Sequence, residues 1–283
     1  MNSNNFGTRL IGGIVIALIG FAIYMSQTQI NPVTGEKQHI SISPKQEIRL
    51  GLESAPEMAR EMGGEVPSTD ARTIEVQHIG EYIVSHTNAA QSPWKFKFHL
   101  LADQKTINAF ALPGGQIFIT LGLLNKLQNE AQLAGVLSHE MGHVLERHSA
   151  QQMAKSQLGQ MLVAAAGTAA SDPNGSGASN SATMIAAMVN HMFQLRYSRH
   201  DESEADQWGL KLMAQSGFDP RSMIKVMEVL KSSGGGHGAE IFQTHPNPDL
   251  RIKQIEAYLA EHPPAANLSE GKNLSEVFQK SSY

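Results

Sequence analysis

The pattern of apolar and polar positions divides the chain into parts of unequal size. Leu10 to Met25 is a run of apolar and glycine residues, LIGGIVIALIGFAIYM. The polar residues that follow, 27–43, contain turn sequences and predict a short tether. Between residues 44 and 262 apolar residues recur at helical and strand spacings, which predicts one folded domain over 44–262. The polar tail, 263–283, predicts no regular element.

The spacing inside this domain indicates helices and a small sheet. Apolar residues at helical spacing predict helices over 44–62 and 69–86. Trp94 to Leu101 and Gln116 to Thr120 have strand character, which implies a small antiparallel sheet. A long helix is expected from Asn129 to Gln152, so the fold class is α+β and mostly helical. Further helices are expected near 201–215, 219–231 and 249–261.

Two more apolar segments, 157–170 and 183–193, flank a loop at 171–182 that is rich in glycine, serine and asparagine. Each segment is too short and interrupted to span a bilayer. Simple core packing is the first expectation for them, and a hairpin that covers a cleft as a lid or dips into a membrane surface is the alternative.

The N-terminal run has the features of a membrane anchor. As a helix it would extend about 24 Å, between a signal-peptide core and a full span. No Ala-x-Ala cleavage site follows it, which favours an uncleaved anchor over a signal segment. Arg9 precedes the run and predicts an N-terminus inside the cytoplasm. We expect residues 1–26 to anchor the chain by a single pass, with the large domain on the periplasmic face of a bacterial inner membrane. A buried core helix and a cytosolic protein are the alternatives.

Composition limits the possible partners and sites. The 22 basic and 26 acidic residues give a formal net charge of −4 without a basic cluster, so we expect no nucleic-acid partner. The chain contains no cysteine, which excludes disulfides, a cysteine nucleophile and cysteine-ligated zinc. Any metal site must therefore use histidine and carboxylate ligands.

A metal-binding pattern lies within the long predicted helix. His139 and His143 are four residues apart, about 40° around a helix and about 6 Å along it, so both imidazoles can reach one ion. Glu140 follows His139 directly in the helix, where its carboxylate can deprotonate a water bound to that ion. The structural alternative is a helix with two hydrogen-bonded surface histidines.

Zinc requires a third protein ligand, and an acidic run downstream supplies a candidate. Glu202 and Asp206 occupy one face of a predicted helix, and Glu204 would face elsewhere. Two histidines, one glutamate and a water form a known catalytic zinc set, and Asp206 could accept the free N–H of a ligand histidine. His148 points away from His139 in a continuous helix and is interpreted as structural. The alternative for the acidic run is a helix start whose carboxylates lie at the positive end of the dipole.

The chain carries four motifs in a fixed order between residues 108 and 252. They are Asn108–Gly115, then His139–Val144 with Arg147-His148, then Tyr197-Ser198-Arg199 leading into Glu202 and Ala205-Asp206, then Thr244-His245-Pro246 with Arg251-Ile252. In this order they resemble the family of membrane-associated zinc endopeptidases that includes HtpX, the CAAX prenyl protease and BepA, and in particular its single-domain, periplasm-facing members. The resemblance implies a gluzincin (zincin-like) metalloprotease fold with one Zn²⁺ per chain. It also implies that His139, His143 and Glu202 hold the zinc and that Glu140 is the general base.

In this family the glycine turn and the strand after it line the cleft, which the resemblance transfers to Gln116–Thr120. That strand would then be an edge strand that pairs with an extended substrate. A plain core hairpin is the alternative, because alternating apolar residues serve either role.

His245 and Arg251 are further candidates for the catalytic site. His245 follows a glycine-rich stretch and precedes Pro246 on a predicted loop. It could donate to the oxyanion of the reaction intermediate, or occupy the fourth zinc position in the resting enzyme and switch catalysis off. An ordinary loop histidine is the third possibility. Arg251 could contact the oxyanion or pin the loop through an ion pair.

Together these features predict a zinc-dependent metalloendopeptidase in which Glu140 assists attack of zinc-bound water on the peptide bond. The expected substrates are misfolded or membrane-associated envelope polypeptides, as in protein quality control. The alternative is a chaperone-like binding module whose zinc site is structural or regulatory. A structural site would be closed by four protein ligands and would not require Glu140. The oligomeric state stays open.

Overall fold

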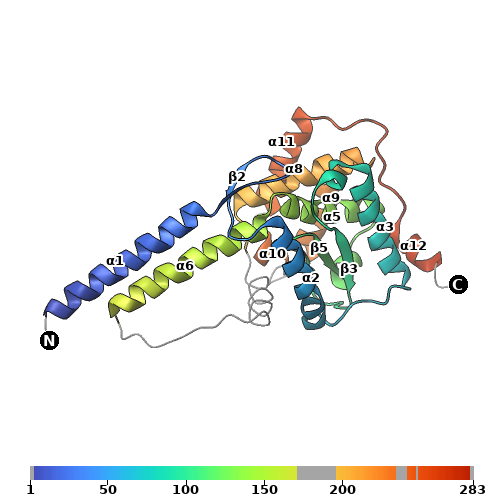
Figure 1. Cartoon of the computed structure of the whole chain (residues 1–283). Helices are drawn as coiled ribbons and strands as arrows, with labels where there is room; N and C mark the ends of the chain where they lie inside the picture. Colours follow the sequence, from blue (N-terminus) through green and yellow to red (C-terminus); the bar gives the residue numbers. More distant parts are fainter. Residues whose placement is uncertain (1–2, 171–195, 234–240, 247, 281–283) are drawn as a thin grey trace.

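The computed structural model describes residues 3–170, 196–233, 241–246 and 248–280 (Figure 1). The first elements are α1 (Ser3–Ser26), β1 (Thr28–Ile30), β2 (Lys37–His39), α2 (Pro44–Glu61), α3 (Ala71–His86), the short 3₁₀ helix η1 (Asn88–Gln91), β3 (Lys97–Leu101), β4 (Ala109–Leu112), β5 (Gln116–Thr120) and α4 (Leu121–Leu124). They are followed by α5 (Glu130–Leu145), α6 (His148–Ala170), α8 (Arg199–Gln215), α9 (Ser222–Ser233), α10 (Ile241–Thr244), α11 (Pro248–Glu261) and α12 (Leu274–Lys280). A mostly helical chain with small sheets confirms the expected α+β class.

The main sheet has the strand order β3-β5-β4, with β3 parallel and β4 antiparallel to β5. The expectation of a purely antiparallel sheet is therefore wrong. β4 and β5 form a hairpin because Gly114 and Gly115 adopt φ values of 80° and 113° in the turn between them, a region that favours glycine. β3 adds to the other side of β5 in the same direction. β5 is thus the central strand, so Gln116–Thr120 is not the edge strand that the resemblance suggested.

Helix α5 lies at the centre of the molecule. Every one of its residues is buried, and it packs against α8, α9, α3 and the strand β4 (Figure 1). Such complete burial explains why α5 lacks a polar face. Its start is fixed by Asn129, whose side chain accepts a hydrogen bond from the backbone N–H of Gln132.

The long helix predicted from Asn129 to Gln152 is two helices. Arg147 has a φ of 61°, a left-handed conformation that ends α5 and lets α6 begin in a new direction at His148. The Arg147 side chain is fully buried, and its Nε donates to Glu47 Oε1 of α2 at 2.8 Å. Its Nη2 also donates to Gln29 and to the backbone carbonyl of Ile42. A buried ion pair thus stabilises the break.

The segments at the two ends of the domain pack onto it. In the region predicted as a tether, β1 and β2 form a hairpin whose Gln38 side chain donates to the carbonyl of Glu146 at 2.9 Å. Asn31 donates in the same way to the carbonyl of Leu145 at 2.9 Å. In the polar tail, α12 includes the buried residue Leu274. The apolar segment 157–170 belongs to α6, whereas 183–193 lies outside the described residues.

Helix α1 lies alongside α6, away from the sheet (Figure 1). Within the part of the chain that the structure describes, no helix is long and apolar enough to cross a membrane. The prediction of a single-pass anchor, and the periplasmic membrane localisation derived from it, is therefore wrong. The apolar run Leu10–Met25 is shorter than the ~20 residues that a span requires, and the turns of α1 before it include the polar residues Asn4, Asn5 and Thr8 and the charged Arg9.

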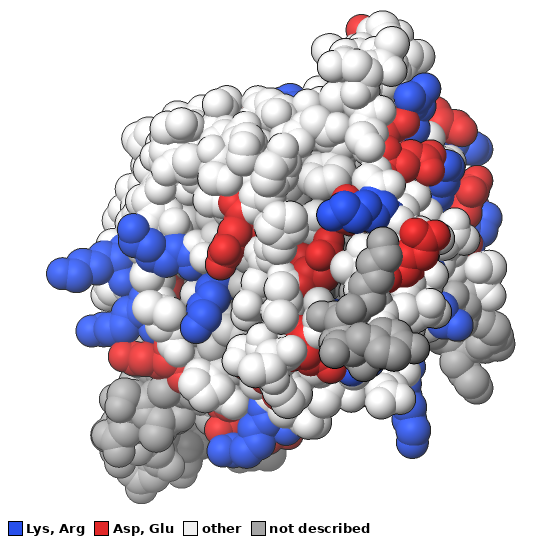
Figure 2. Space-filling model, turned by 90° about the vertical axis from the view of Figure 1, so that its right-hand side faces the viewer, with Lys and Arg blue, Asp and Glu red and all other residues white. Residues whose placement is uncertain are grey.

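The face of the molecule in Figure 2 carries both basic and acidic side chains, separated by wide uncharged areas. Some surface charges of the described residues form ion pairs, as Lys225 does with Glu270. The charge of this face therefore does not point to one kind of charged partner.

The buried ion pair at the helix break gives a stability prediction. Arg147→Met should lower the free energy of unfolding by about 3–5 kcal/mol, because it leaves the Glu47 carboxylate buried without its partner. The double variant with Glu47→Gln should recover part of this loss. Lys225→Met removes an exposed ion pair and should cost about 0–1 kcal/mol. Denaturant unfolding measures all three variants, and equal losses for Arg147→Met and Lys225→Met would contradict the assigned role.

Candidate metal centre

The candidate site is built where α5 and α8 cross at very short distance. A Cβ atom at Gly142 would lie 2.8 Å from the carbonyl oxygen of Ala205, so only glycine fits there. The capping box of Ser198 and Asp201 fixes the start of α8. Asp201 thus acts as the capping-box partner of Ser198, while Glu202 and Asp206 face the histidines of α5.

Four side chains from three regions meet at one point. His139 and His143 of α5, Glu202 of α8 and His245 after α10 have ligand atoms that all lie within 4.8 Å of one another. The Nε2 atoms of His139 and His143 are 3.1 Å apart, and Glu202 Oε1 lies 3.6 Å from His143 Nε2. His245 Nδ1 lies 3.3 Å from His139 Nε2 and 3.0 Å from Glu202 Oε1.

These spacings fit a zinc ion. Ligand atoms bound tetrahedrally at about 2.0–2.1 Å are separated by about 3.3 Å, which is close to the spacings of this cluster. Burial and the neighbouring positive groups lower the pKa of His143 well below its usual value, so its imidazole is neutral, the form that binds metal. Burial opposes ionisation of Glu202, yet His245 and Arg251 keep its pKa below the usual value. The donor set is therefore two or three imidazoles, that of His143 neutral, and one carboxylate.

Asp206 and Arg251 form a second layer around this cluster. Asp206 Oδ1 lies 3.0 Å from His139 Nδ1, where it can accept the ring proton. Arg251 of α11 donates from Nε and Nη2 to Asp206 at 2.8 and 2.6 Å, and its Nη1 lies 2.7 Å from Glu202 Oε2. Burial opposes the charge on Asp206, but the guanidinium holds its pKa far below the usual range. Arg251 thus forms ion pairs with Glu202 and Asp206 and holds both carboxylates in place.

Glu140 has the environment of a reactive carboxylate. It is only 1% exposed, and neither of its carboxylate oxygens has a hydrogen-bond partner among the described residues. Oε1 lies 3.7 Å from His245 Nε2, which also lacks a partner in the described part of the chain. Burial raises the pKa of Glu140 above its usual value. A buried carboxylate without a partner is costly for stability, so it points to a chemical role.

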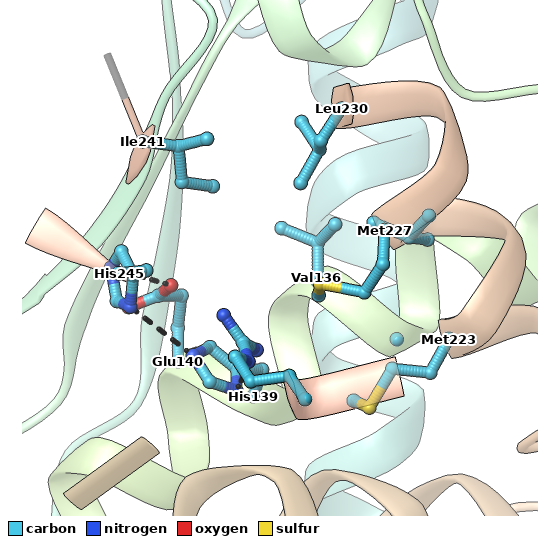
Figure 3. A pocket seen from close by; sticks show the side chains of 11 residues that line it. Val136, His139, Glu140, Met223, Met227, Leu230, Ile241 and His245 are labelled. Atoms are coloured by element: carbon cyan, nitrogen blue, oxygen red, sulfur yellow. Dashed lines mark hydrogen bonds and ion pairs between the residues drawn. The ribbon is translucent and has the colours of Figure 1, made fainter. Parts of the chain in front are cut away.

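An apolar pocket adjoins these residues (Figure 3). Met223, Met227 and Leu230 of α9 lie across the pocket from His245, and Val136 of α5 lies between them and His139. Ile241 closes the pocket near His245. The pocket thus lies directly beside Glu140 and is lined mainly by apolar side chains.

Three residues of the site could not be assigned from the sequence. The ring of Tyr197 is stacked on that of His143, with centroids 3.8 Å apart, and its backbone N–H donates to the carbonyl of Thr244 next to His245. His148, interpreted as structural, contacts His143 because the helix breaks before it. Glu204 in turn contacts His148. Tyr197 and His148 stand in the quoted motifs, but no periodicity places them.

Comparison with known proteins agrees with this geometry. Residues 70–259 match the model of peptidase family M48. The mitochondrial metalloendopeptidase OMA1 of Schizosaccharomyces pombe is 30% identical over 90% of this chain and 72% of its own length. OMA1 of Saccharomyces cerevisiae is 28% identical over 83% of this chain and 70% of its own length.

A bacterial relative is similar over nearly the same part of this chain. The beta-barrel assembly-enhancing protease of Escherichia coli is 29% identical over 88% of this chain. The match covers 50% of that protein, so the chain spans about half the length of this relative. The family match and the metalloendopeptidase relatives confirm the resemblance and decide against a non-enzymatic module. The chain belongs to peptidase family M48 and is a zinc-dependent metalloendopeptidase.

Proposed function

We propose that His139, His143 and Glu202 hold the catalytic zinc and that Glu140 is the general base of peptide-bond hydrolysis. The observation that carries this proposal is the buried Glu140 carboxylate, which has no hydrogen-bond partner among the described residues and lies beside the ligand cluster. When bound, zinc supplies Lewis-acid polarisation of the scissile carbonyl and makes the attacking water more acidic.

The protein side chains then divide the remaining work. Glu140 takes a proton from the attacking water and passes it to the leaving amine, and its raised pKa favours proton uptake. Asp206 accepts the Nδ1 proton of His139 and so fixes which ring nitrogen faces the metal. Arg251 holds Glu202 and Asp206 through its ion pairs, which supports a positioning role over contact with the oxyanion.

His245 is proposed as the fourth ligand of the resting enzyme. Its Nδ1 lies within the ligand cluster, at 3.0 Å from Glu202 Oε1. In this position it occupies the place that an attacking water needs, so proteolysis requires His245 to move away. Donation to the oxyanion, the other catalytic role considered, would begin only after such a movement.

The proposed substrates are extended polypeptides with large apolar side chains. β4, unlike β5, is an edge strand of its sheet and packs against α5, so an extended substrate segment would lie along β4. An apolar side chain of that segment would enter the pocket formed by Met223, Met227 and Leu230. Misfolded polypeptides expose such side chains, which supports a role in protein quality control. Envelope proteins are the proposed source, because the name of the E. coli relative links that protein to β-barrel assembly.

The division of roles predicts separable defects. Glu140→Gln should still bind about one zinc per chain but lose activity on a casein-like substrate by on the order of 10²-fold or more. His139→Ala should lose both zinc and activity. Metal analysis together with a peptidase assay distinguishes the two outcomes. Wild-type activity of Glu140→Gln would exclude the proposed mechanism.

Removal of His245 should release the resting state. His245→Ala is expected to raise basal proteolysis of an unfolded substrate and to weaken zinc binding, because one ligand is lost while the water position opens. Initial rates and competition with a chelator measure these effects. A lower kcat without a change in zinc affinity would support the oxyanion role, and unchanged kinetics would remove His245 from the site.

The apolar pocket should control which side chains are accepted. Met227→Phe narrows the pocket and should lower kcat/KM for peptides with a large apolar side chain next to the cleaved bond by about tenfold or more, with little effect on alanine-containing peptides. Met58→Phe makes the same change in the separate core cluster beside α2 and should leave this preference unchanged. An unaltered preference in Met227→Phe would show that substrate side chains bind elsewhere.

A further inference from the structure

Behind His143 the structure places a chain of polar contacts that the proposed mechanism does not use. His148 is 1% exposed, and its Nδ1 lies 2.9 Å from the Nδ1 of His143. On the other side of its ring, His148 Nε2 lies 3.1 Å from Glu204 Oε2. Glu204 also contacts the exposed His200 at 3.0 Å, so the contacts extend from the metal centre to the surface.

The positions of the hydrogen atoms in this series of contacts follow from the chemistry of imidazole. A neutral histidine carries one ring proton, so His143 must carry it on Nδ1 when Nε2 faces the metal. His148 Nδ1 then has to accept that proton, and the ring proton of His148 lies on Nε2. From there it is donated to the Glu204 carboxylate. Every polar atom of both rings thus has one role, without conflict.

We propose that His148 and Glu204 are positioning residues that orient His143 for zinc binding. The inference rests on the proposed zinc ligands. It gives His143 a counterpart to the carboxylate of Asp206, which contacts His139 directly. A partner that accepts the second ring proton fixes the tautomer and rotation of a ligand histidine and makes its free nitrogen more basic.

The helix break makes this arrangement possible. In a continuous helix, the residue five positions after His143 would point away from it. The left-handed Arg147 instead redirects the chain, so that His148 begins α6 with its ring against His143. Glu204 reaches the same ring from α8, although helical spacing sets it apart from Glu202.

A second metal site is the competing interpretation of these residues. Ligand atoms of His148, Asp201 and Glu204 lie within 4.8 Å of one another. A cation there would need an unprotonated His148 Nε2, and the His148 proton would then move to Nδ1. Two protonated Nδ1 atoms, those of His143 and His148, would face each other at 2.9 Å. The geometry therefore favours the orienting chain over a second metal.

Three substitutions of His148 separate its two contacts. In His148→Asn the amide oxygen takes the place of Nδ1 and still accepts from His143. In His148→Gln the amide nitrogen reaches the place of Nε2 and donates to Glu204, but His143 loses its acceptor. His148→Leu loses both contacts. Zinc affinity, measured by chelator competition on the full chain, should fall about 10- to 100-fold in the Gln and Leu variants and less than about threefold in the Asn variant.

Substitution of Glu204, at the outer end of this series of hydrogen bonds, provides a milder test. Glu204 is partly exposed, so Glu204→Ala should fold, and its zinc affinity should fall about threefold to tenfold because water replaces the carboxylate. Glu204→Gln keeps an acceptor oxygen and should bind zinc like the wild type. In ¹⁵N-histidine spectra of the zinc-loaded protein, His148 should carry its proton on Nε2.

His99 offers a matched control outside the site. It is also buried, with Nδ1 3.0 Å from a Glu65 carboxylate oxygen and Nε2 3.1 Å from Gln116. His99→Leu should lower the melting temperature as His148→Leu does, but should leave zinc affinity unchanged.

Several outcomes would overturn the inference. Wild-type zinc affinity in both His148→Leu and Glu204→Ala would show that these two residues do not position His143 for zinc binding. Equal affinities of the Asn and Gln variants would show that acceptance from His143 is irrelevant. Two zinc ions per wild-type chain, one of them lost in Glu204→Ala, would establish the second metal site instead. A wild-type protein that binds no zinc would refute the proposed ligands themselves.

Discussion

The close approach of α5 and α8 is the constraint on which the metal centre depends. At Gly142 the two backbones are so near that a Cβ atom would touch the carbonyl of Ala205, and at Gly209 it would lie 3.4 Å from the backbone nitrogen of His139. This proximity brings a carboxylate of α8 to the histidines of α5 without long side chains. Short, well-packed links hold ligands in position more rigidly than flexible ones.

The same proximity concentrates ionised groups in the interior, where each of them is costly to bury. Burial opposes the charge on Arg251, but its ion pairs with Asp206 and Glu202 hold the pKa of the guanidinium above the usual value, so it is fully charged. Glu140 is the exception, because none of its described neighbours donates a hydrogen bond to it. The site thus pairs the carboxylates of Glu202 and Asp206 with Arg251 and leaves Glu140 without a hydrogen-bond partner among the described residues.

Local spacing was sufficient to identify the residues that one helix turn brings together, such as His139 with His143, and to give the α+β class. It failed where a distant partner decides the conformation. The break at Arg147 depends on Glu47, which is far away in the sequence. Because the break was not predicted, the direction of the His148 side chain was predicted wrongly as well. The prediction of an antiparallel sheet failed for a similar reason, since tertiary packing sets the parallel pairing of β3 with β5. The apolar run of α1 was overinterpreted because composition alone does not measure span length.

The wide sequence separation of the site residues has a consequence for the order of maturation. His139 and His245 are 106 residues apart, and in an unfolded chain only the histidines of one helical segment are close enough to share an ion. The complete donor set therefore exists only after α5, α8 and the segment before α11 have assembled. Metal that binds only the native state adds its binding free energy to stability. A chain in which these segments have not yet assembled therefore lacks the complete donor set and cannot hydrolyse a peptide bond at this centre.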